Sequence, residues 1–598
     1  MRELEHFPNL VTMFFTRAAA LGDKPFLWRK TGGRWQSQSW RETAAQVAAL
    51  AAGLKRIGMK PGDTIMLVSE NRPEWCVADL AIMAAGCVTV PTYTTNTERD
   101  HQHILEDSEA KAVIVSTDKL SRAVMPSVLR SSRVRALIGI EKLRIGQASG
   151  DAEFYDWQAL IDGERPDVAG IARESENVTR DDLACIIYTS GTGGSPRGVM
   201  QHHGAILHNV EGCVDVISND FGWDDEVFLS FLPLSHAYEH TAGQHLPIGL
   251  GGQIYYAEGI EKLAANISEV RPTIMVVVPR LFEVLRTRIT KEIEKQGGIA
   301  PWLLDRALAI GAKRYRGETS LRDKPIDLLI GVTLRPKIVK RFGGRLKAMV
   351  SGGAPLTPEV GVFFDSLGLT LMQGYGQTES APVVSCNRPS VGLAMDTVGP
   401  PLANTEVRIA KDGEILVRGE LVMHGYWRNP EESALVLRDG WLHTGDIGLI
   451  DAKGRIKITD RKKDIIVNDK GDNVAPQRVE GMLTLQPEIA QAMIYGDRRP
   501  YMVALLVPDP EWTQQWCARN GDACNFARLA ENSEYRTALG HAVERVNAEL
   551  SLTERIRRFV LADEPFGIEN EQLTPSLKIR RHVLKQVYGA RLEGLYKS

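Results

Sequence analysis

The 598-residue sequence lacks features that mark several large classes of protein. It has no strong charge of one sign, because 72 Lys and Arg stand against 75 Asp and Glu for a net charge of −3. Proteins that bind nucleic acid through bulk charge carry a clear basic excess, so that class is not expected. The longest weakly apolar run, from about Val77 to Val90, contains Asp79 and is too short to span a membrane.

Cysteine is scarce, and its pattern indicates a reducing environment. The seven Cys are widely scattered, and no CxxC pair occurs, which predicts reduced thiols. The first residues, MRELEHFPNL, have mixed charge and lack the apolar core of a signal peptide. We therefore expect a cytoplasmic protein, with no transmembrane segment and with peripheral contact to the inner face of a membrane as a further possibility.

The composition of the chain is that of an ordinary globular protein, and its predicted helices and strands alternate regularly. Its length predicts at least two domains. Ser39 and Glu42 have capping-box spacing before an alanine-rich helix that ends near Gly58. Buried strands are then predicted at TIMLVS, CVTVPTY and AVIVST, with helices between them. This alternation predicts parallel sheets covered on both faces, and it resumes in EVFLSFLPL, GQIYYAE, TIMVVVP and RLKAMVSGG.

The pattern changes to short antiparallel pieces from about Glu406. VRIAKDGEILVRG and GLIDAKGRIKITD contain the Asp-Gly and Lys-Gly turns typical of hairpins. The charged stretch TDRKKD, residues 459–464, then precedes mixed helices and strands, and we place a domain boundary there. The prediction is an α/β protein with a large N-terminal domain (1–463) of stacked, mostly parallel sheets and a β-rich subdomain, and a small α+β C-terminal domain (464–598).

The loop YTSGTGGSPRGVM, residues 188–200, follows the apolar run LACIIYTS and is rich in glycine and hydroxyl groups. Backbone amides and hydroxyls presented after a buried strand are suited to phosphate oxygens. The loop does not match the Walker A pattern GxxxxGK[ST], because Pro196-Arg197 stands where Gly-Lys would be needed. Nor is it a dinucleotide fingerprint, since Pro196 occupies the third glycine position. A flexible surface turn is the plainer alternative.

Several further motifs give this loop its context. SGGAPL (351–356), QGYGQTES (373–380), GYWRNP (425–430), GWLHTGDIG (440–448), ITDRKKDIIV (458–467) and LTPSLKIRR (573–581) follow in order. Together with the loop they resemble the adenylate-forming (AMP-forming) acyl-CoA synthetase superfamily. ENRPEW (70–75) and the block from Arg286 to Leu346 look most like the long-chain fatty acyl-CoA synthetases. The resemblance covers nearly the whole chain, from about Phe15 to Arg581.

The resemblance implies roles for the residues of these motifs. Thr378 would meet the α-phosphate of ATP as part of the catalytic set, and Glu379, with Thr192, would hold Mg²⁺, because a carboxylate beside a triphosphate needs a cation between them. Tyr375 would stack on adenine. The phosphate loop would contribute Thr189, Ser190, Gly191, Thr192, Gly193 and Arg197, and the adenine and its surroundings would be bordered by Gly352, Gly353, Ala354, Gly374, Tyr375 and Gly376.

Other implied roles concern the ribose, the hinge and the transfer step. Asp446 would accept hydrogen bonds from both ribose hydroxyls, and Arg461 would contact the ribose. Lys463 would be the hinge of a mobile C-terminal domain, and Gly471 would lie in the loop that helps to form the thiol tunnel. Lys578 would be the adenylation lysine, which orients the carboxylate and offsets charge during transfer. Its PSLK context sets it apart from an ordinary solvated lysine.

Some positions depart from the family pattern. Gly193 replaces a threonine, and Arg197 replaces a lysine while keeping the positive charge. Gln373 and His240 stand where many members have glutamate and arginine. His236-Ala-Tyr-Glu239-His240 also fits an inverted zinc-protease motif, H-x-x-E-H. We favour the resemblance to the family's LPLxHxxE block instead, in which His236 lies near the acyl and pantetheine passages, because zinc needs both histidines on one helix face and a third ligand.

The resemblance implies an ATP-dependent long-chain fatty acid–CoA ligase. A fatty carboxylate would attack the α-phosphate of MgATP to give acyl-AMP and pyrophosphate, and the CoA thiol would then release AMP. Alternatives are a CoA ligase for another hydrophobic acid (medium-chain, aryl or other), a luciferase-like oxidase, and a non-catalytic nucleotide-binding relative. A peptide-synthetase module is disfavoured because only 20 residues follow Lys578. Fatty acid, ATP and CoA are the expected partners, and a homodimer is possible.

Overall fold

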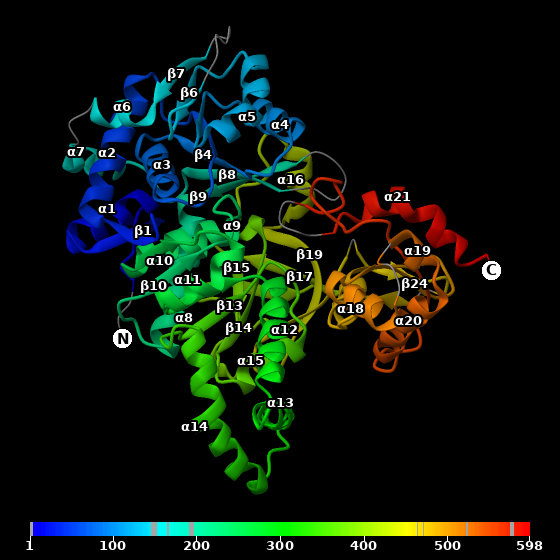
Figure 1. Ribbon diagram of the computed structural model, residues 1–598. Coiled ribbons are helices and arrows are strands. Elements are labelled where there is room, and N and C mark those ends of the chain that lie inside the picture. Colours follow the sequence, from blue (N-terminus) through cyan, green and yellow to red (C-terminus); the bar gives the residue numbers. More distant parts are fainter. Residues whose placement is uncertain are drawn as a thin grey trace.

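The computed structural model describes residues 4–144, 152–163, 167–189, 196–462, 464–470, 472–521, 524, 526–574 and 579–597. The chain forms two large sheets, a curled antiparallel subdomain and a small C-terminal part (Figure 1). The predicted α/β class with mostly parallel sheets, a β-rich subdomain and an α+β C-terminal part is confirmed. Within the described ranges, no helix combines the length and the apolar character that crossing a membrane requires.

The first sheet has seven strands in the order β7-β6-β5-β3-β4-β8-β9, and only β9 runs antiparallel to its neighbour. Its central strands are buried along their whole length, as parallel strands between two helical layers must be. The strands are β3 (Thr64–Val68), β4 (Val88–Thr92), β5 (Ala112–Val115), β6 (Ala136–Gly139), β7 (Glu153–Asp156), β8 (Leu183–Thr189) and β9 (Arg197–His202). The helices are α2 (Trp40–Arg56), α3 (Pro73–Ala84), α4 (Glu98–Asp107), α5 (Asp118–Arg130), α6 (Trp157–Asp162) and α7 (Val168–Ser175).

The second sheet has eight strands in the order β15-β14-β13-β12-β10-β11-β1-β2, with β2 and β15 antiparallel at its two edges. The strands are β1 (Pro25–Thr31), β2 (Arg34–Ser39), β10 (Val227–Ser230), β11 (Gln253–Tyr256), β12 (Ile274–Val277), β13 (Ala348–Ser351), β14 (Leu371–Gly376) and β15 (Val383–Cys386). Its helices are α1 (Leu10–Leu21), α8 (His203–Asp220), α9 (Ala237–Glu239), α10 (Leu246–Leu250), α11 (Leu263–Val270) and α15 (Pro358–Ser366).

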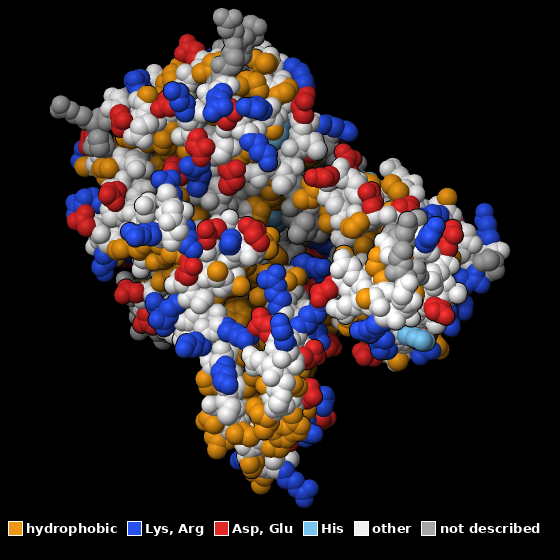
Figure 2. Space-filling view, viewed as in Figure 1, with side chains coloured by type: hydrophobic (Ala, Val, Ile, Leu, Met, Phe, Trp, Pro, Cys, Tyr) orange, Lys and Arg blue, Asp and Glu red, His pale blue; other side chains and the backbone are white. Residues whose placement is uncertain are grey.

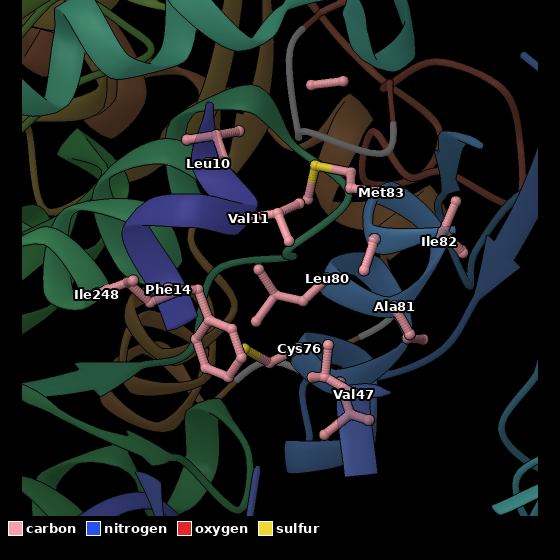
Figure 3. Close-up of a cluster of buried hydrophobic side chains, with 14 of the residues drawn as sticks. Leu10, Val11, Phe14, Val47, Cys76, Leu80, Ala81, Ile82, Met83 and Ile248 are labelled. Carbon is pink, nitrogen blue, oxygen red and sulfur yellow. The ribbon is translucent and has the colours of Figure 1, made fainter. Parts of the chain in front are cut away.

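The largest hydrophobic core joins these two halves. Leu10, Val11 and Phe14 of α1 belong to one cluster with Leu80 of α3 and Ile248 of α10, and Val11 and Phe14 lie beside Leu80 (Figure 3). All five side chains are fully buried. Shortening one such buried leucine to alanine costs about 2–5 kcal/mol. Separating the two sheets would expose many of these side chains, so this shared core holds the sheets together.

Three helices form an arm that projects from the second sheet: α12 (Pro279–Gln296), α13 (Ala300–Arg316) and α14 (Lys324–Arg341) (Figure 1). Phe282, Ile310 and Leu334 anchor one helix each in the second core. Gly311 lets α13 approach α15 closely, because a Cβ there would meet the Ser366 hydroxyl at 1.7 Å.

The hairpins predicted after Glu406 are present. β17 pairs antiparallel with β16 and β19, and β19 pairs with β20. The subdomain consists of β16 (Glu406–Ile409), β17 (Glu414–Arg418), α16 (Pro430–Val436), β18 (Leu437–Arg438), β19 (Trp441–Ile450) and β20 (Ile456–Arg461).

The C-terminal part is built on a three-stranded sheet, β23-β24-β25, with a separate two-stranded ribbon. Its elements are β21 (Ile466–Val467), β22 (Asn473–Val474), α17 (Pro476–Thr484), β23 (Ile489–Tyr495), β24 (Met502–Pro508), α18 (Pro510–Asn520), α19 (Phe526–Glu531), α20 (Ser533–Asn547), β25 (Ile556–Leu561) and α21 (Arg581–Gly594).

One sequence prediction is wrong in this C-terminal part. Cys517 and Cys524 form a disulfide, whereas reduced thiols were predicted throughout. Their Cα atoms lie 5.8 Å apart, which is within the range that a disulfide spans. A spacing of seven residues matches no familiar cysteine-pair motif, so this disulfide could not be predicted from the sequence pattern. The other five cysteines are free.

Candidate functional site

A cavity of about 570 Å³ opens where the two sheets, the antiparallel subdomain and the C-terminal part meet. Its volume is in the range of small-molecule sites in proteins. The ends of β8, β13 and β14 reach it, as do Arg461 of β20 and Asp464 and Arg580 from the C-terminal part. Eleven of the sequence-predicted site residues line it: Thr189, Arg197, His236, Gly352, Gly353, Gly374, Tyr375, Gly376, Thr378, Glu379 and Arg461.

Glycines form one wall because side chains would not fit. A Cβ on Gly376 would meet the Pro382 carbonyl oxygen at 1.7 Å, and one on Gly352 would meet the Tyr238 ring at 2.7 Å. Gly353 has φ +81°, a conformation that favours glycine. The packing of Pro382 and Tyr238 against this wall, and the φ of Gly353, therefore require glycine at these positions. Ala354 is exposed and is not among the described residues that line the cavity.

Tyr375 and Asp446, which are buried, form a polar group at the cavity with the partly exposed Arg461. The Tyr375 hydroxyl donates to Asp446 Oδ2 at 2.7 Å, and Arg461 Nε donates to Asp446 Oδ1 at 3.0 Å. Asp446 and Arg461 face each other across the β19–β20 ladder, which sets this contact. Burial, together with the Asp446 charge, raises the pKa of Tyr375 well above its usual value, so the phenol stays a donor. Asp446 is itself only 4% exposed and lies behind the other two.

Thr378 and Glu379 follow β14 in a short 3₁₀ turn (Thr378–Ser380). Gln201 Nε2 donates to the Thr378 carbonyl at 2.7 Å, which fixes the turn against β9. Glu379 Oε1 accepts a hydrogen bond from the Tyr426 hydroxyl at 2.8 Å. A carboxylate oxygen held in this way on the cavity wall is a suitable ligand for a hard divalent cation.

Arg197 stands at the mouth of the phosphate-type loop. It pairs with Thr189 across the β8–β9 ladder, so the two ends of the loop are fixed at the cavity. Arg197 Nη1 lies 2.8 Å from Glu432 Oε2, and its guanidinium carbon lies 4.4 Å from the centre of the Tyr426 ring. The arginine is therefore held between a carboxylate and an aromatic face. Sequence reasoning missed Glu432 and Tyr426.

An apolar branch of the cavity runs along one face of α8. Cys213, Val216, Ile217 and Phe221 line it and recur at three- to four-residue spacing, so they share a helix face. The other apolar side chains that line the cavity include Leu246, Ile274, Val276, Ala348, Val350, Met372, Val383 and Cys386. A pocket lined both by polar groups and by these apolar side chains suits an amphipathic acid.

Comparison with known proteins agrees with this geometry. A model of the family described as AMP-binding enzyme matches residues 14–427, and a model of the AMP-binding enzyme C-terminal domain matches residues 463–598. The chain belongs to the AMP-binding enzyme family. It is 32% identical over 597 residues to the long-chain-fatty-acid–CoA ligase FadD15 of Mycobacterium tuberculosis, covering 99% of this chain and 97% of that protein. It is 30% identical to the human long-chain-fatty-acid–CoA ligase 6, covering 99% and 87%.

Solved structures share the fold. The adenylation domain of a carboxylate reductase from Mycobacterium chelonae superposes with a TM-score of 0.76 at 24% identity, covering 99% of this chain and 92% of that one. The corresponding domain from Segniliparus rugosus, solved with AMP and a co-purified carboxylic acid, also gives 0.76 at 22% identity, covering 99% and 95%. Members of the family use ATP. One family model matches the larger N-terminal part of this chain, and the other matches its smaller C-terminal part.

Seven residues assigned by resemblance lie outside the described residues: Ser190, Gly191, Thr192, Gly193, Lys463, Gly471 and Lys578. Their assigned roles stay predictions. Arg580, two residues after Lys578, lines the cavity, and so does Asp464, next to Lys463.

The histidines of the H-x-x-E-H motif have separate surroundings. His236 caps α9, where its Nδ1 accepts from the Tyr238 amide, and it lines the cavity. His240 is fully buried and lies in a π-helical turn (His240–His245), where its Nε2 lies 2.9 Å from Asp79 Oδ2. Gln244 Nε2 donates to the same oxygen at 2.7 Å, and His245 Nε2 lies 3.5 Å from it. The His240 ring and the Gln244 amide thus compensate charge on Asp79 Oδ2, whereas Asp79 Oδ1 is buried with no hydrogen-bond partner among the described residues.

Proposed function

We propose that this protein is a long-chain fatty acid–CoA ligase that activates its acid as an acyl-adenylate. The observation that carries the proposal is the continuity of one cavity. Its polar end is lined by Tyr375, Thr378 and Arg461, and its apolar end is lined along α8. An acid bound with its chain along α8 presents its carboxylate to the phosphates of a nucleotide bound at the glycine wall.

The polar end has the groups that the first half-reaction needs. The carboxylate of the acid would attack the α-phosphate of ATP to give acyl-AMP and pyrophosphate. Asp446 with Tyr375 and Arg461 would hold the ribose side, and Thr378 would meet the α-phosphate. Glu379 faces the same space and, with Thr192, would hold Mg²⁺, which would offset the phosphate charge. Lys578 would orient the attacking carboxylate as the catalytic lysine.

The second half-reaction would use the same acyl-adenylate. The thiol of CoA would attack the acyl carbonyl and release AMP. We propose that the chain divides into residues 1–463 and 464–598, and that the smaller part turns about Lys463 between the two steps. This turn would withdraw Lys578 and bring the Gly471 loop toward the cavity near His236. The presence of Asp464 and Arg580 on the cavity wall supports a C-terminal part that reaches the site.

Two findings favour a long-chain acid over other acids. The curated relatives named above are long-chain ligases and match this chain over almost its whole length. Apolar side chains from Cys213 to Phe221 line the same cavity as the glycine wall. Burying each methylene contributes about 0.8 kcal/mol, so such a lining favours acids with long apolar chains. A CoA ligase for a medium-chain or aryl acid is the alternative.

The test is CoA-dependent release of AMP by the purified protein across saturated and unsaturated acids from acetate to oleate. The proposal expects kcat/KM to rise with chain length and to be highest for acids of about sixteen carbons. A maximum at benzoate or at acids of eight carbons or fewer would replace the long-chain assignment with the alternative. Absence of AMP release with every acid would contradict the ligase itself.

A further inference from the structure

The arm formed by α12, α13 and α14 holds most of the highly exposed large hydrophobic side chains of the described residues. Seven large hydrophobics in the described residues are more than 60% exposed, and four of them lie within residues 299–332. These four are Leu321 (77%), Leu328 (71%), Val332 (68%) and Ile299 (64%). Figure 2 shows hydrophobic side chains gathered over the projecting end of the arm. Single exposed leucines need no explanation, whereas a group of them marks an interaction surface.

Helix α14 explains why this surface is apolar. Its inner face is formed by Ile330, Leu334 and Ile338, which recur every four residues and are buried in the second core. Leu328 and Val332, also four residues apart, form a second stripe that faces solvent. A helix that is apolar on two faces and covered on only one has a face available for a partner. We define the arm patch as Leu321, Leu328, Leu329 and Val332.

The charge around the arm patch indicates the chemistry of that partner. Residues 279–341 contain 15 Lys and Arg and 7 Asp and Glu, whereas the rest of the chain contains 57 and 68. The acids nearest the patch are already neutralised within the arm: Asp323 by Lys313, and Asp327 by Arg314 and Arg335.

Three exposed basic residues flank the patch. No described acid forms an ion pair with Arg322, Lys324 or Lys337. The patch therefore presents apolar side chains within a net positive surface. That combination is typical of segments that lie on anionic bilayers.

We propose that the arm patch docks peripherally on a phospholipid bilayer containing anionic lipids. Leu321, Leu328 and Val332 would enter the headgroup–acyl boundary, and Arg322, Lys324 and Lys337 would meet lipid phosphates. A second copy of this chain is a poorer occupant, because two arms of the same net positive charge would repel each other. The patch also lies on the projecting arm (Figure 1). A projecting arm can insert into the headgroup region of a bilayer, whereas it would make little contact with a flat protein surface. If the proposed function holds, the docked arm would keep the enzyme at the membrane that stores its acid.

The experiment measures co-flotation of the full-length protein with vesicles, without acid, ATP or CoA, so its outcome does not depend on the proposed function. Vesicles of phosphatidylcholine alone are compared with vesicles that also contain phosphatidylglycerol. Wild type should bind the anionic vesicles at least tenfold more strongly, and raising the salt to about 0.5 M should weaken that binding. Leu328→Ser with Val332→Ser, and separately Lys324→Glu with Lys337→Glu, should each lower binding to the anionic vesicles by about tenfold or more.

The matched control carries Ile260→Ser and Leu552→Ser, which remove hydrophobics of equal exposure outside the arm. It should bind as wild type does. The proposal is overturned if the two arm variants bind anionic vesicles as wild type does, or if wild type binds neither kind of vesicle. It is also overturned in favour of a protein interface if light scattering shows a wild-type dimer that Leu328→Ser with Val332→Ser dissociates, with vesicle binding unchanged.

Discussion

The Tyr375 hydroxyl lies 2.7 Å from Asp446 Oδ2 and donates a hydrogen bond to it, although the residues are 71 positions apart. The contact joins the end of β14 in the second sheet to β19 in the antiparallel subdomain. Arg461 binds the other carboxylate oxygen, so the three side chains hold one another at the polar part of the cavity.

Tyr375→Phe should therefore weaken nucleotide binding. Loss of a hydrogen bond to a charged group costs about 1.5–3 kcal/mol, so we expect KM for ATP to rise by about tenfold or more, with KM for the fatty acid little changed. Tyr315→Phe is the matched control, because the Tyr315 hydroxyl donates to Asp396 at 3.0 Å on an exposed part of the surface. Steady-state kinetics with varied ATP gives the comparison. Equal KM values in the two variants would remove Tyr375 from the nucleotide site.

Arg197 is predicted to act on the phosphates of ATP. Arg197→Lys should retain most activity because the charge is kept, whereas Arg197→Ala should raise KM for ATP by about tenfold. Glu432→Gln should leave KM for ATP unchanged or lower it, since the Arg197 guanidinium then has no carboxylate partner at Glu432. Arg418→Ala, which breaks an exposed pair with Glu406 in the same subdomain, serves as the control. An Arg197→Ala enzyme with wild-type KM would contradict the role.

The apolar branch along α8 is predicted to hold the acyl chain. Val216→Trp should fill the branch and lower kcat/KM for palmitate by at least tenfold relative to that for hexanoate. Asn219→Trp places the same ring on the exposed face of α8 and should leave this ratio unchanged. The ratio from competing-substrate assays decides between them. A Val216→Trp variant with the wild-type ratio would show that the chain binds elsewhere.

Buried histidines predict acid sensitivity of the fold. His101 is fully buried, neither ring nitrogen has a hydrogen-bond partner among the described residues, and burial lowers its pKa to about 4. The unfolded chain takes up this proton near pH 6.5, so the free energy of unfolding falls as pH drops below 6.5 and levels off only below 4. His101 alone should account for a loss of about 2 kcal/mol between pH 7 and pH 5.

The measurement is the urea midpoint at pH 7 and pH 5. His101→Leu should reduce the difference between the two midpoints, while His541→Leu, at an exposed position, should not. His203 and His245, whose pKa values burial lowers to about 3 and about 4, will keep part of the dependence in both variants. A His101→Leu protein with the full wild-type difference would contradict a neutral buried His101.

Local features of the fold were predictable because the residues that determine them are neighbours. Ser39 and Glu42 form the reciprocal capping box that their spacing predicts, with the Ser39 amide 2.7 Å from the Glu42 carboxylate. Gly58, expected to end the same helix, has φ +93° just after it. The Asp-Gly turn between β16 and β17 also follows from adjacent residues, with φ +84° at Gly413.

Long-range contacts could not be derived in this way. Resemblance to a family placed Tyr375 and Asp446 in one site, but nothing in the sequence paired Arg197 with Glu432, 235 positions away. In the sequence, Asp79 stands out only as a charge within an apolar run. In the core, its carboxylate accepts a hydrogen bond from Gln244 and lies 2.9 Å from His240 Nε2. Such pairs depend on how the sheets pack, which periodicity does not report. The exposed stripe of α14 was likewise invisible, because apolar residues on two faces of a helix look like ordinary core positions.

The central claim, activation of a long-chain acid as its adenylate, is tested most directly by ATP–pyrophosphate exchange without CoA. Exchange should require an added fatty acid, should be faster with palmitate than with acetate, and should be abolished in Lys578→Ala. The same variant should still form palmitoyl-CoA from supplied palmitoyl-AMP, because Lys578 serves only the first half-reaction. Exchange that is absent with every carboxylic acid, or that persists at the wild-type rate without Lys578, would contradict the account.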